Sequence, residues 1–159
     1  MNNRKRKKIS KEDALSKMER YCAYQDRCHY EVKNKLWELG FWGDWAGEII
    51  VQLIEDDFLN EERFACSFAR GKFRMKRWGR VKISKKLREK RITPRLIKFA
   101  IEKEIEEEVY LETLNMLIDK KRRLLKVEDV FIQNGKIANY CIQKGYEVGL
   151  VWQVLKIKI

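Results

Sequence analysis

Residues 35–41 read Lys35-Leu36-Trp37-Glu38-Leu39-Gly40-Phe41, and this stretch decides the fold because it recurs. Similar stretches are Lys86-Leu87-Arg88-Glu89-Lys90-Arg91-Ile92 and Tyr140-Cys141-Ile142-Gln143-Lys144-Gly145-Tyr146. A longer segment with helical apolar periodicity precedes each stretch, and a turn with a short apolar segment follows it. A period of about fifty residues is typical of tandem arrays, in which each unit buries part of its apolar face against its neighbour. The sequence therefore predicts an all-α fold, with three tandem three-helix repeats that form an elongated, curved array.

The composition and the cap residues favour helices throughout. The 159 residues include one proline and eight glycines, too few turn residues for an all-β sandwich or barrel. Ser10-Lys11-Glu12-Asp13 has the spacing of a helix-capping box. Thr93-Pro94 supplies a cap residue followed by a proline at the first helical position. We therefore expect helices to begin just after Ser10 and at Pro94.

A third helix is expected from near Asn60 toward Arg77. Its apolar stripe is predicted to hold Phe64, Phe68, Met75 and Trp78. Gly71 lies on the same stripe, which predicts a close helix crossing there. A further long helix is expected around Tyr110, Leu114, Leu117, Leu124 and Leu125.

These elements predict the domain organisation. Residues 1–11 form a basic N-terminal tail, 12–58 the first helical repeat, 59–105 the second and 106–159 the third. The alternating end of the chain, Leu155-Lys156-Ile157-Lys158-Ile159, has a strand-like pattern. We assign it to a helix because it occupies the last position of the third repeat.

The net charge of +12 is concentrated in two segments. Arg4 to Lys11 contains six basic residues and no acidic residue, whereas Arg70 to Arg91 contains twelve basic residues against the single acid Glu89. Acidic stretches lie on both sides of the second segment. Because this segment also carries apolar side chains, it differs from a purely solvated tail. A polyanion such as nucleic acid is the expected kind of partner.

The candidate binding residues are the basic side chains at the start of this segment and the aromatic ring among them. They are Arg70, Lys72, Phe73, Arg74, Lys76, Arg77, Arg80 and Lys82. Basic grooves with stacking rings are typical of single-strand nucleic-acid binding. The alternative is that the cations only solvate one face and that Phe73 belongs to the core.

Two other segments are weaker candidates. A second basic patch consists of Lys120, Lys121, Arg122 and Arg123, and its role is either partner binding or solubility. The turn Gly40-Phe41-Trp42-Gly43-Asp44-Trp45 is rich in aromatic residues. Trp42 is expected to pack between repeats, with an exposed anchor for a partner as the alternative.

Patterns that carry catalysis or bind metals and cofactors are missing from the sequence. His29 is the only histidine, and Cys22, Cys28 and His29 lack the spacing of a common zinc site. No glycine-rich stretch is followed by the Lys-Ser/Thr of a phosphate-binding loop. We therefore expect a non-enzymatic protein with no metal and no cofactor. The four cysteines form no CxxC pair and are expected to be reduced and buried.

The location of the protein is predicted from its apolar segments. Charges interrupt every apolar run before the roughly 18 residues that a spanning helix needs. The basic N-terminus continues into Ser10-Lys11-Glu12-Asp13 and not into an apolar secretory segment. A cytoplasmic protein without membrane contact is expected.

Two stretches of the second repeat resemble the RecX family of regulators of the RecA recombinase. Phe58-Leu59-Asn60-Glu61-Glu62-Arg63-Phe64-Ala65 resembles the family stretch that opens the second repeat. Gly79-Arg80-Val81-Lys82-Ile83-Ser84-Lys85-Lys86-Leu87, followed by Ile92, resembles the segment that comes after it. The chain departs from the family pattern at Glu61, where Asp is usual, at Lys86, where Glu is preferred, and at Arg91, where Gly is preferred. The last two changes make the second repeat more basic.

The resemblance implies a monomeric regulator that binds along a RecA filament on single-stranded DNA and inhibits its ATPase and strand-exchange activities. Such a protein would act in recombination, DNA repair and the SOS response. The alternatives left open by the residues themselves are a helix-turn-helix type transcriptional regulator or other helical DNA-binding protein, and a helical scaffold for a different protein partner.

Overall fold

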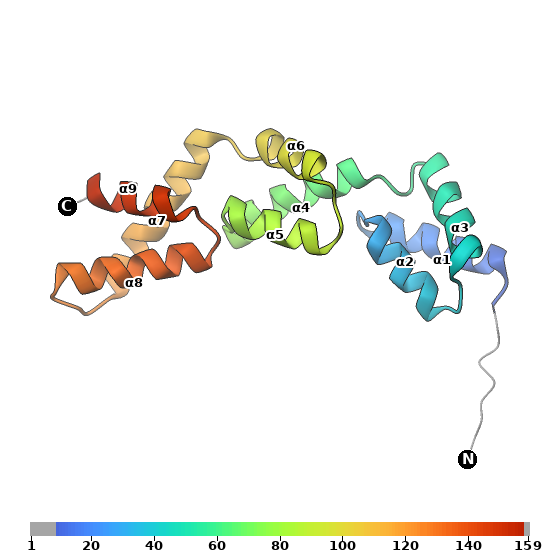
Figure 1. The fold of residues 1–159 in the computed structure, drawn as a ribbon, viewed down its shortest axis with the longest axis horizontal. Coiled ribbons are helices and arrows are strands. Elements are labelled where there is room, and N and C mark those ends of the chain that lie inside the picture. Colours follow the sequence, from blue (N-terminus) through green and yellow to red (C-terminus); the bar gives the residue numbers. More distant parts are fainter. Residues whose placement is uncertain (1–8, 158–159) are drawn as a thin grey trace, which may run out of the picture. The chain divides into compact units, whose positions relative to one another are not determined.

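In the computed structural model, residues 9–157 are described, and they form nine α-helices and no strand (Figure 1). The predicted all-α fold is confirmed. The helices are α1 (Lys11–Tyr24), α2 (His29–Glu38), α3 (Gly43–Glu55), α4 (Glu61–Lys76), α5 (Arg80–Glu89), α6 (Pro94–Glu104), α7 (Glu107–Leu124), α8 (Val130–Gln143) and α9 (Val148–Ile157). Most of the basic N-terminal segment, residues 1–8, and the last two residues lie outside the described part.

Local sequence signals determine where several of these helices begin. The Ser10 hydroxyl accepts a hydrogen bond from the Asp13 N–H, and the Thr93 hydroxyl accepts one from the Leu96 N–H. Both caps satisfy backbone donors that the first helical turn leaves unpaired. The helices predicted to begin after Ser10 and at Pro94 are therefore confirmed.

Packing groups the helices into two compact units. The N-terminal unit contains the described residues up to Phe64 together with Lys90–Ile92, and the C-terminal unit contains Ala65–Glu89 and the described residues from Thr93 onward. In the N-terminal unit, α1, α2 and α3 pack around a core that includes Met18, Leu36, Ile49 and Leu53.

The C-terminal unit buries one face of each of its helices. Helix α5 packs on α6, with Ile83, Leu87, Ile97 and Ala100 buried. Helix α7 packs on α8 and α9. The side chains buried by this second group include Tyr110, Leu114, Ile118, Ile137, Cys141 and Val151.

The three similar stretches share one backbone turn. Gly40, Arg91 and Gly145 have φ of 89°, 61° and 103°, in the left-handed region. The residue after each is buried: Phe41, Ile92 and Tyr146 are 6%, 3% and 1% exposed. In the first and third copies the buried residue donates its N–H five positions back, to Leu36 and Cys141. This pattern ends one helix and directs the next side chain into the core.

The predicted apolar stripe on α4 is wrong at one position, because Met75 is 85% exposed and Phe73 is only 5% exposed. The buried face of α4 follows Ala65, Ala69 and Phe73, at steps of four residues. Small alanines carry this face, so a search for large apolar side chains does not find it. Arg77 takes a left-handed φ of 56° and ends the helix, so Trp78 follows the helix in the turn to α5.

The close crossing predicted at Gly71 is also wrong, because a Cβ placed there meets no neighbouring atom. The close approach lies at Gly79. A Cβ on Gly79 would be 2.3 Å from the carbonyl carbon and oxygen of Gly145. The backbone N–H groups of Gly79 and Val81 donate to the carbonyls of Lys144 and Gly145, both at 2.9 Å. This turn-to-turn contact joins the start of α5 to the turn before α9.

Candidate nucleic-acid interface

The predicted binding segment covers the second half of α4, the turn to α5 and the first turn of α5. Arg74 and Lys76 are exposed near the end of α4. Arg77 is half-buried, and its carbonyl accepts a hydrogen bond from the Tyr146 hydroxyl at 3.0 Å. Arg74 and Lys76 therefore leave their charges available to solvent, whereas Arg77 also anchors the turn through its backbone.

Two arginines of the segment are bound to carboxylates. Arg70 Nη1 lies 3.3 Å from Glu104 on α6. Arg80 Nη2 lies 2.6 Å from the Glu147 carboxylate, and Arg80 Nη1 lies 2.7 Å from Glu107. Each guanidinium charge is thus balanced by a partner from another helix or turn. These two residues contribute more to packing between elements than to a free positive surface.

Tyr110 organises the Arg80 cluster. The guanidinium of Arg80 lies 4.0 Å from the centre of the Tyr110 ring. The Tyr110 hydroxyl accepts from the Arg80 backbone N–H at 3.1 Å and donates to Glu147 at 2.5 Å. Tyr110 also stacks on Tyr146, with ring centres 4.9 Å apart. The Tyr110 hydroxyl, the Arg80 backbone N–H and the Glu147 carboxylate therefore all have hydrogen-bond partners.

The cluster changes the pKa values of its members. Burial alone would raise the pKa of the Glu147 carboxyl, but hydrogen bonds from Arg80 and Tyr110 outweigh it and hold that pKa below its usual value. Burial, together with the bond to Glu147, raises the pKa of Tyr110. The cluster therefore contains a charged Arg80–Glu147 pair and a neutral tyrosine at neutral pH.

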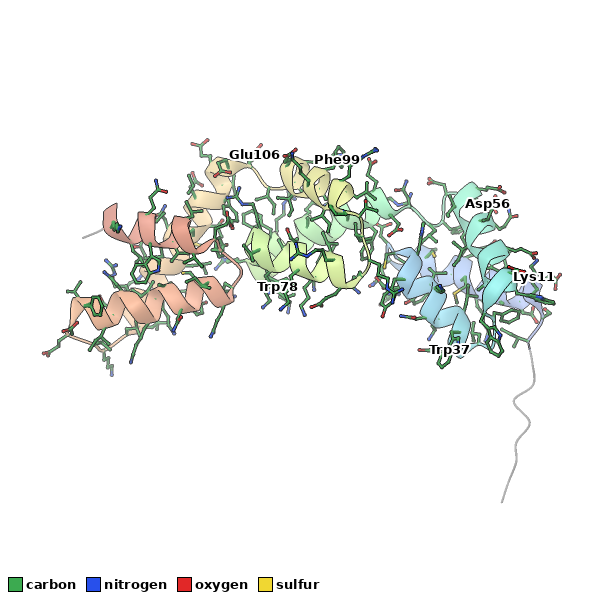
Figure 2. All side chains as sticks on the ribbon, viewed as in Figure 1. Lys11, Trp37, Asp56, Trp78, Phe99 and Glu106 are labelled. Carbon is green, nitrogen blue, oxygen red and sulfur yellow. The ribbon has the colours of Figure 1, made fainter. Side chains whose placement is uncertain are left out.

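Phe73 lies in the core, where its ring centre is 5.9 Å from that of Tyr110. The ring near the basic side chains is that of Trp78, which is labelled in Figure 2. Lys72 Nζ lies 5.0 Å and Lys82 Nζ 4.4 Å from the Trp78 ring centre. Of the eight predicted residues, the structure brings Lys72 and Lys82 together beside one ring.

The second basic patch is divided in a similar way. Lys120 and Arg123 are exposed, whereas Lys121 and Arg122 are half-buried. Arg122 donates to the side-chain oxygen of Asn134 at 3.1 Å. Lys121 Nζ lies 4.9 Å from the centre of the Tyr140 ring on α8.

Tyr140 and Lys144 were missed by the sequence analysis. Lys144 Nζ lies 5.9 Å from the Tyr140 ring centre and donates to the Lys76 carbonyl at 3.2 Å. Both residues lie in the third copy of the recurring stretch. The available signal was the spacing of four residues between Tyr140 and Lys144, which puts two side chains on one face of a helix.

The Trp-rich turn opens toward solvent. Trp42 is 64% exposed, so the expectation that it packs between repeats is not met. Phe41, Trp42 and Trp45 line a pocket of about 350 Å³ together with Gly40 and residues 9–11. Lys11, at the edge of this pocket, forms an ion pair with Glu48.

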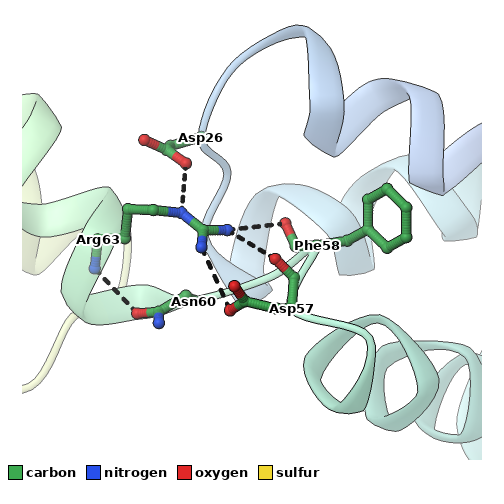
Figure 3. Close-up of polar contacts among 5 residues, drawn as sticks. All are labelled: Asp26, Asp57, Phe58, Asn60 and Arg63. Carbon is green, nitrogen blue, oxygen red and sulfur yellow. Dashed lines mark hydrogen bonds and ion pairs between the residues drawn. The ribbon is translucent and has the colours of Figure 1, made fainter.

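The stretch from Phe58 to Ala65 has a structural role (Figure 3). The side-chain oxygen of Asn60 accepts from the Arg63 N–H at 2.9 Å and so caps α4. The Arg63 guanidinium donates to Asp26 at 2.8 Å, to the Asp57 carboxylate at 3.2 Å, and to the backbone carbonyls of Asp57 and Phe58. One side chain thus fixes the connection between α1 and α2 to the connection between α3 and α4.

The sulfur and imidazole side chains that the sequence analysis considered for a metal have other surroundings. All four cysteines are buried. Burial raises the pKa of Cys22, Cys28 and Cys141 to about 11. His29 Nδ1 lies 2.9 Å from Glu61. Among residues 9–157 no three His, Cys, Asp or Glu side chains gather in the way that a metal ion requires.

In the part of the chain that the structure describes, every helix is too short or too polar to cross a membrane.

Comparisons with known proteins agree with the resemblance of the second repeat. Residues 60–101 match the family model described as "RecX, second three-helix domain". The chain is 25% identical over 126 residues to the regulatory protein RecX of Bacillus cytotoxicus and 23% identical to that of Bacillus thuringiensis. Each match covers 79% of this chain and 46% of the relative, so the chain spans about half the length of these relatives.

Solved structures show the same fold. The crystal structure of RecX from Lactobacillus salivarius superposes with a TM-score of 0.81 at 23% identity, over 92% of this chain and 97% of that one. A second crystal structure of a regulatory protein RecX also gives a TM-score of 0.81, over 92% of this chain and 71% of that one. These matches show that the second repeat is similar in sequence to that of RecX regulatory proteins and that the described helices share the fold of the RecX crystal structures.

Proposed function

We propose that this chain is a non-enzymatic, cytoplasmic and monomeric regulator that binds a RecA-type recombinase filament on single-stranded DNA. Binding would inhibit the ATPase and strand-exchange activities of the filament and so restrain recombination, DNA repair and the SOS response. Its working units would be three three-helix repeats, over 12–58, 59–105 and 106–159. The similarity to proteins named regulatory protein RecX supports the regulatory role, and the charge on the second of these repeats supports the partner.

One structural observation carries the choice of a polyanionic partner. At the centre of the basic segment, Lys72 and Lys82 lie beside the Trp78 ring and Arg74 and Lys76 are exposed, while Arg70 and Arg80 already have carboxylate partners. Lysines without a carboxylate partner give the surface a positive potential, which attracts both phosphate groups and acidic protein surfaces. A filament that contains DNA and protein offers both.

The test is cosedimentation of the protein with ATP-loaded recombinase filaments, with bare single strands and with duplex DNA, over a series of salt concentrations. We expect the filament to retain the protein at salt concentrations that release it from bare DNA. A parallel assay should show that the DNA-dependent ATPase rate of the recombinase falls as the protein is added. Equal retention on all three polymers, or an unchanged ATPase rate at saturating protein, would contradict the proposal. Preferential binding to duplex DNA would favour the alternative of a helix-turn-helix type regulator.

A further inference from the structure

The pocket beside the Trp-rich turn, which we call the Trp pocket, has no part in the proposed function. It belongs to the N-terminal unit and is formed by the start of α1, the turn after α2 and the first turn of α3. Its volume of about 350 Å³ is near the lower end for ligand pockets, so it suits one long side chain better than a large cofactor. The lining residues are Ile9, Ser10, Lys11, Gly40, Phe41, Trp42 and Trp45.

Three aromatic rings line the Trp pocket. The Phe41 ring is buried, and its centre lies 6.2 Å from that of the Trp45 ring. Trp42 and Trp45 are 64% and 58% exposed, so a large part of each indole remains in contact with solvent. Exposed tryptophans beside a pocket are typical anchors for a binding partner, because one rigid ring buries much apolar area. The rings therefore offer accessible faces to a side chain that enters from outside.

One ammonium group already lies at the edge of the Trp pocket. Lys11 Nζ is 6.0 Å from the centre of the Trp45 ring, and an ion pair with Glu48 balances its charge. The face of an aromatic ring attracts a cation, and the attraction increases when water is excluded. The position of Lys11 shows that a cation is compatible with these rings. In the described part of the chain, no cation lies over the Trp42 ring.

Three carboxylates leave the surroundings of the Trp pocket negative. Glu12 and Asp13 lie in the first turn of α1, and Asp44 lies in the first turn of α3. All three are exposed, and among residues 9–157 none of them has an ion-pair partner. Each helix N-terminus carries about half a positive charge, so the two helix starts together offset about one of the three carboxylates. The remaining negative charge favours a cation in the pocket.

We propose that the Trp pocket binds a lysine or arginine side chain from a basic segment of a partner protein. The cation would lie against the Trp42 ring, and the basic residues beside it would be attracted by Glu12, Asp13 and Asp44. The same three carboxylates would repel a phosphate group, and they would contribute nothing to the binding of an uncharged side chain. The inference goes beyond the proposed function, because it concerns the N-terminal unit and requires neither DNA nor the recombinase.

The experiment follows the indole N–H signals of the full chain by proton–nitrogen NMR while penta-arginine is added. The five tryptophans give one signal each, and single substitutions to phenylalanine assign them. We expect the signals of Trp42 and Trp45 to shift along a saturable curve. The signal of Trp37 should stay in place, although this ring is 68% exposed and does not line the pocket. Penta-citrulline, which has a similar shape without the charge, should shift none of the signals at the same concentrations.

Matched variants separate the ring from general exposure. Trp42→Ala should weaken penta-arginine binding about 5- to 30-fold when the Trp45 signal is followed, since a contact between a cation and a ring is lost. Trp37→Ala removes an equally exposed indole and should leave the affinity unchanged. Shifts of the Trp37 signal as large as those of Trp42, or equal binding of penta-citrulline or penta-glutamate, would overturn the inference. So would a Trp42→Ala variant that keeps its helical circular dichroism and binds like the wild type.

A second pair of variants tests the carboxylates. Glu12→Gln/Asp44→Asn should weaken penta-arginine binding, and the difference from the wild type should shrink as salt is added. The control Glu55→Gln/Glu62→Gln removes two exposed acids elsewhere in the N-terminal unit, with the same change in net charge. Equal losses in the two pairs would overturn the inference, because binding would then depend only on the total charge of the protein.

The chain itself contains competing cations, because Lys7 and Lys8 precede Ile9 in the sequence. Lys7→Gln/Lys8→Gln is therefore compared with Lys17→Gln/Lys33→Gln, which removes two exposed lysines from α1 and α2 with the same change in net charge. We expect both pairs to bind penta-arginine with the same affinity. If the first pair binds at least tenfold more tightly than the second, the chain's own lysines occupy the pocket, and the assignment to a partner protein is wrong.

Discussion

Replacing Gly79 by alanine tests the turn-to-turn contact directly. The new Cβ would be 2.3 Å from the carbonyl carbon and oxygen of Gly145 and 2.5 Å from the Tyr146 nitrogen. Non-bonded carbon contacts are favourable at about 3.5–4.0 Å, so the two turns must separate by more than about 1 Å. The hydrogen bonds that join them, both 2.9 Å long, would then be broken.

The expected loss of stability follows from these two effects. Two hydrogen bonds contribute about 1 kcal/mol each, and forced overpacking costs about 1–3 kcal/mol more. Gly79→Ala should therefore lower the free energy of unfolding by about 4 kcal/mol. Gly71→Ala is the matched control, because its Cβ meets no neighbouring atom and lies in the interior of α4. Alanine is a better helix former than glycine, so this variant should gain up to about 1 kcal/mol.

The assay is urea unfolding at neutral pH, followed by circular dichroism at 222 nm. With a slope of about 2 kcal/mol per molar urea, the midpoint of the C-terminal unit should fall by about 2 M in Gly79→Ala. In Gly71→Ala it should stay equal or rise. If both variants unfolded at the wild-type midpoint, Gly79 would not hold a backbone contact. If both were destabilised alike, the identification of Gly79 in place of Gly71 would be wrong.

Two further substitutions test the polar clusters. Arg63→Ala removes the bonds to Asp26, Asp57 and Phe58 and should reduce the free energy of unfolding by about 2–3 kcal/mol in chemical denaturation. The control Arg20→Ala, on the exposed face of α1, should change this free energy by less than about 0.5 kcal/mol. Equal effects of the two would refute the role of Arg63. The pKa of Glu147 is held below its usual value of 4.5, so its contribution is fully present above about pH 4.5 and is lost as the pH falls through the lower folded value. Glu147→Gln should thus unfold more easily than the wild type at pH 7, and the difference should shrink toward pH 3; a difference that is independent of pH would contradict the ion pair.

Local chemistry explains why so much of the helical arrangement could be predicted. Ser10 and Thr93 cap their helices through hydrogen bonds that span only three residues, so the sequence contains both partners. Gly145 and Tyr146 likewise repeat the pattern of Gly40 and Phe41 within a single turn. Signals of this kind depend on neighbours along the chain and do not require knowledge of the packing.

The distribution of usable charge could not be predicted in the same way. Arg80 and Lys82 look equivalent in sequence, yet Arg80 is bound to Glu147, which is 67 residues away. Only the contact between the turns at Gly79 and Gly145 brings those side chains together. The burial of Phe73 in place of the expected Met75 has a similar cause, because the buried face of α4 follows the small side chains of Ala65 and Ala69. Such outcomes depend on tertiary packing, which overrides the apolar periodicity of one helix.

The burial of all four thiols has a practical consequence. Cys22 and Cys28 belong to the N-terminal unit, whereas Cys66 and Cys141 belong to the C-terminal unit. Only the thiolate reacts with an alkylating reagent, and it forms readily only when the sulfur reaches water. Peptide mass spectrometry of iodoacetamide-treated protein would therefore report the opening rate of each unit in the same sample. The wild-type chain thus contains two site-resolved probes for local unfolding in each unit, and it needs no engineered label.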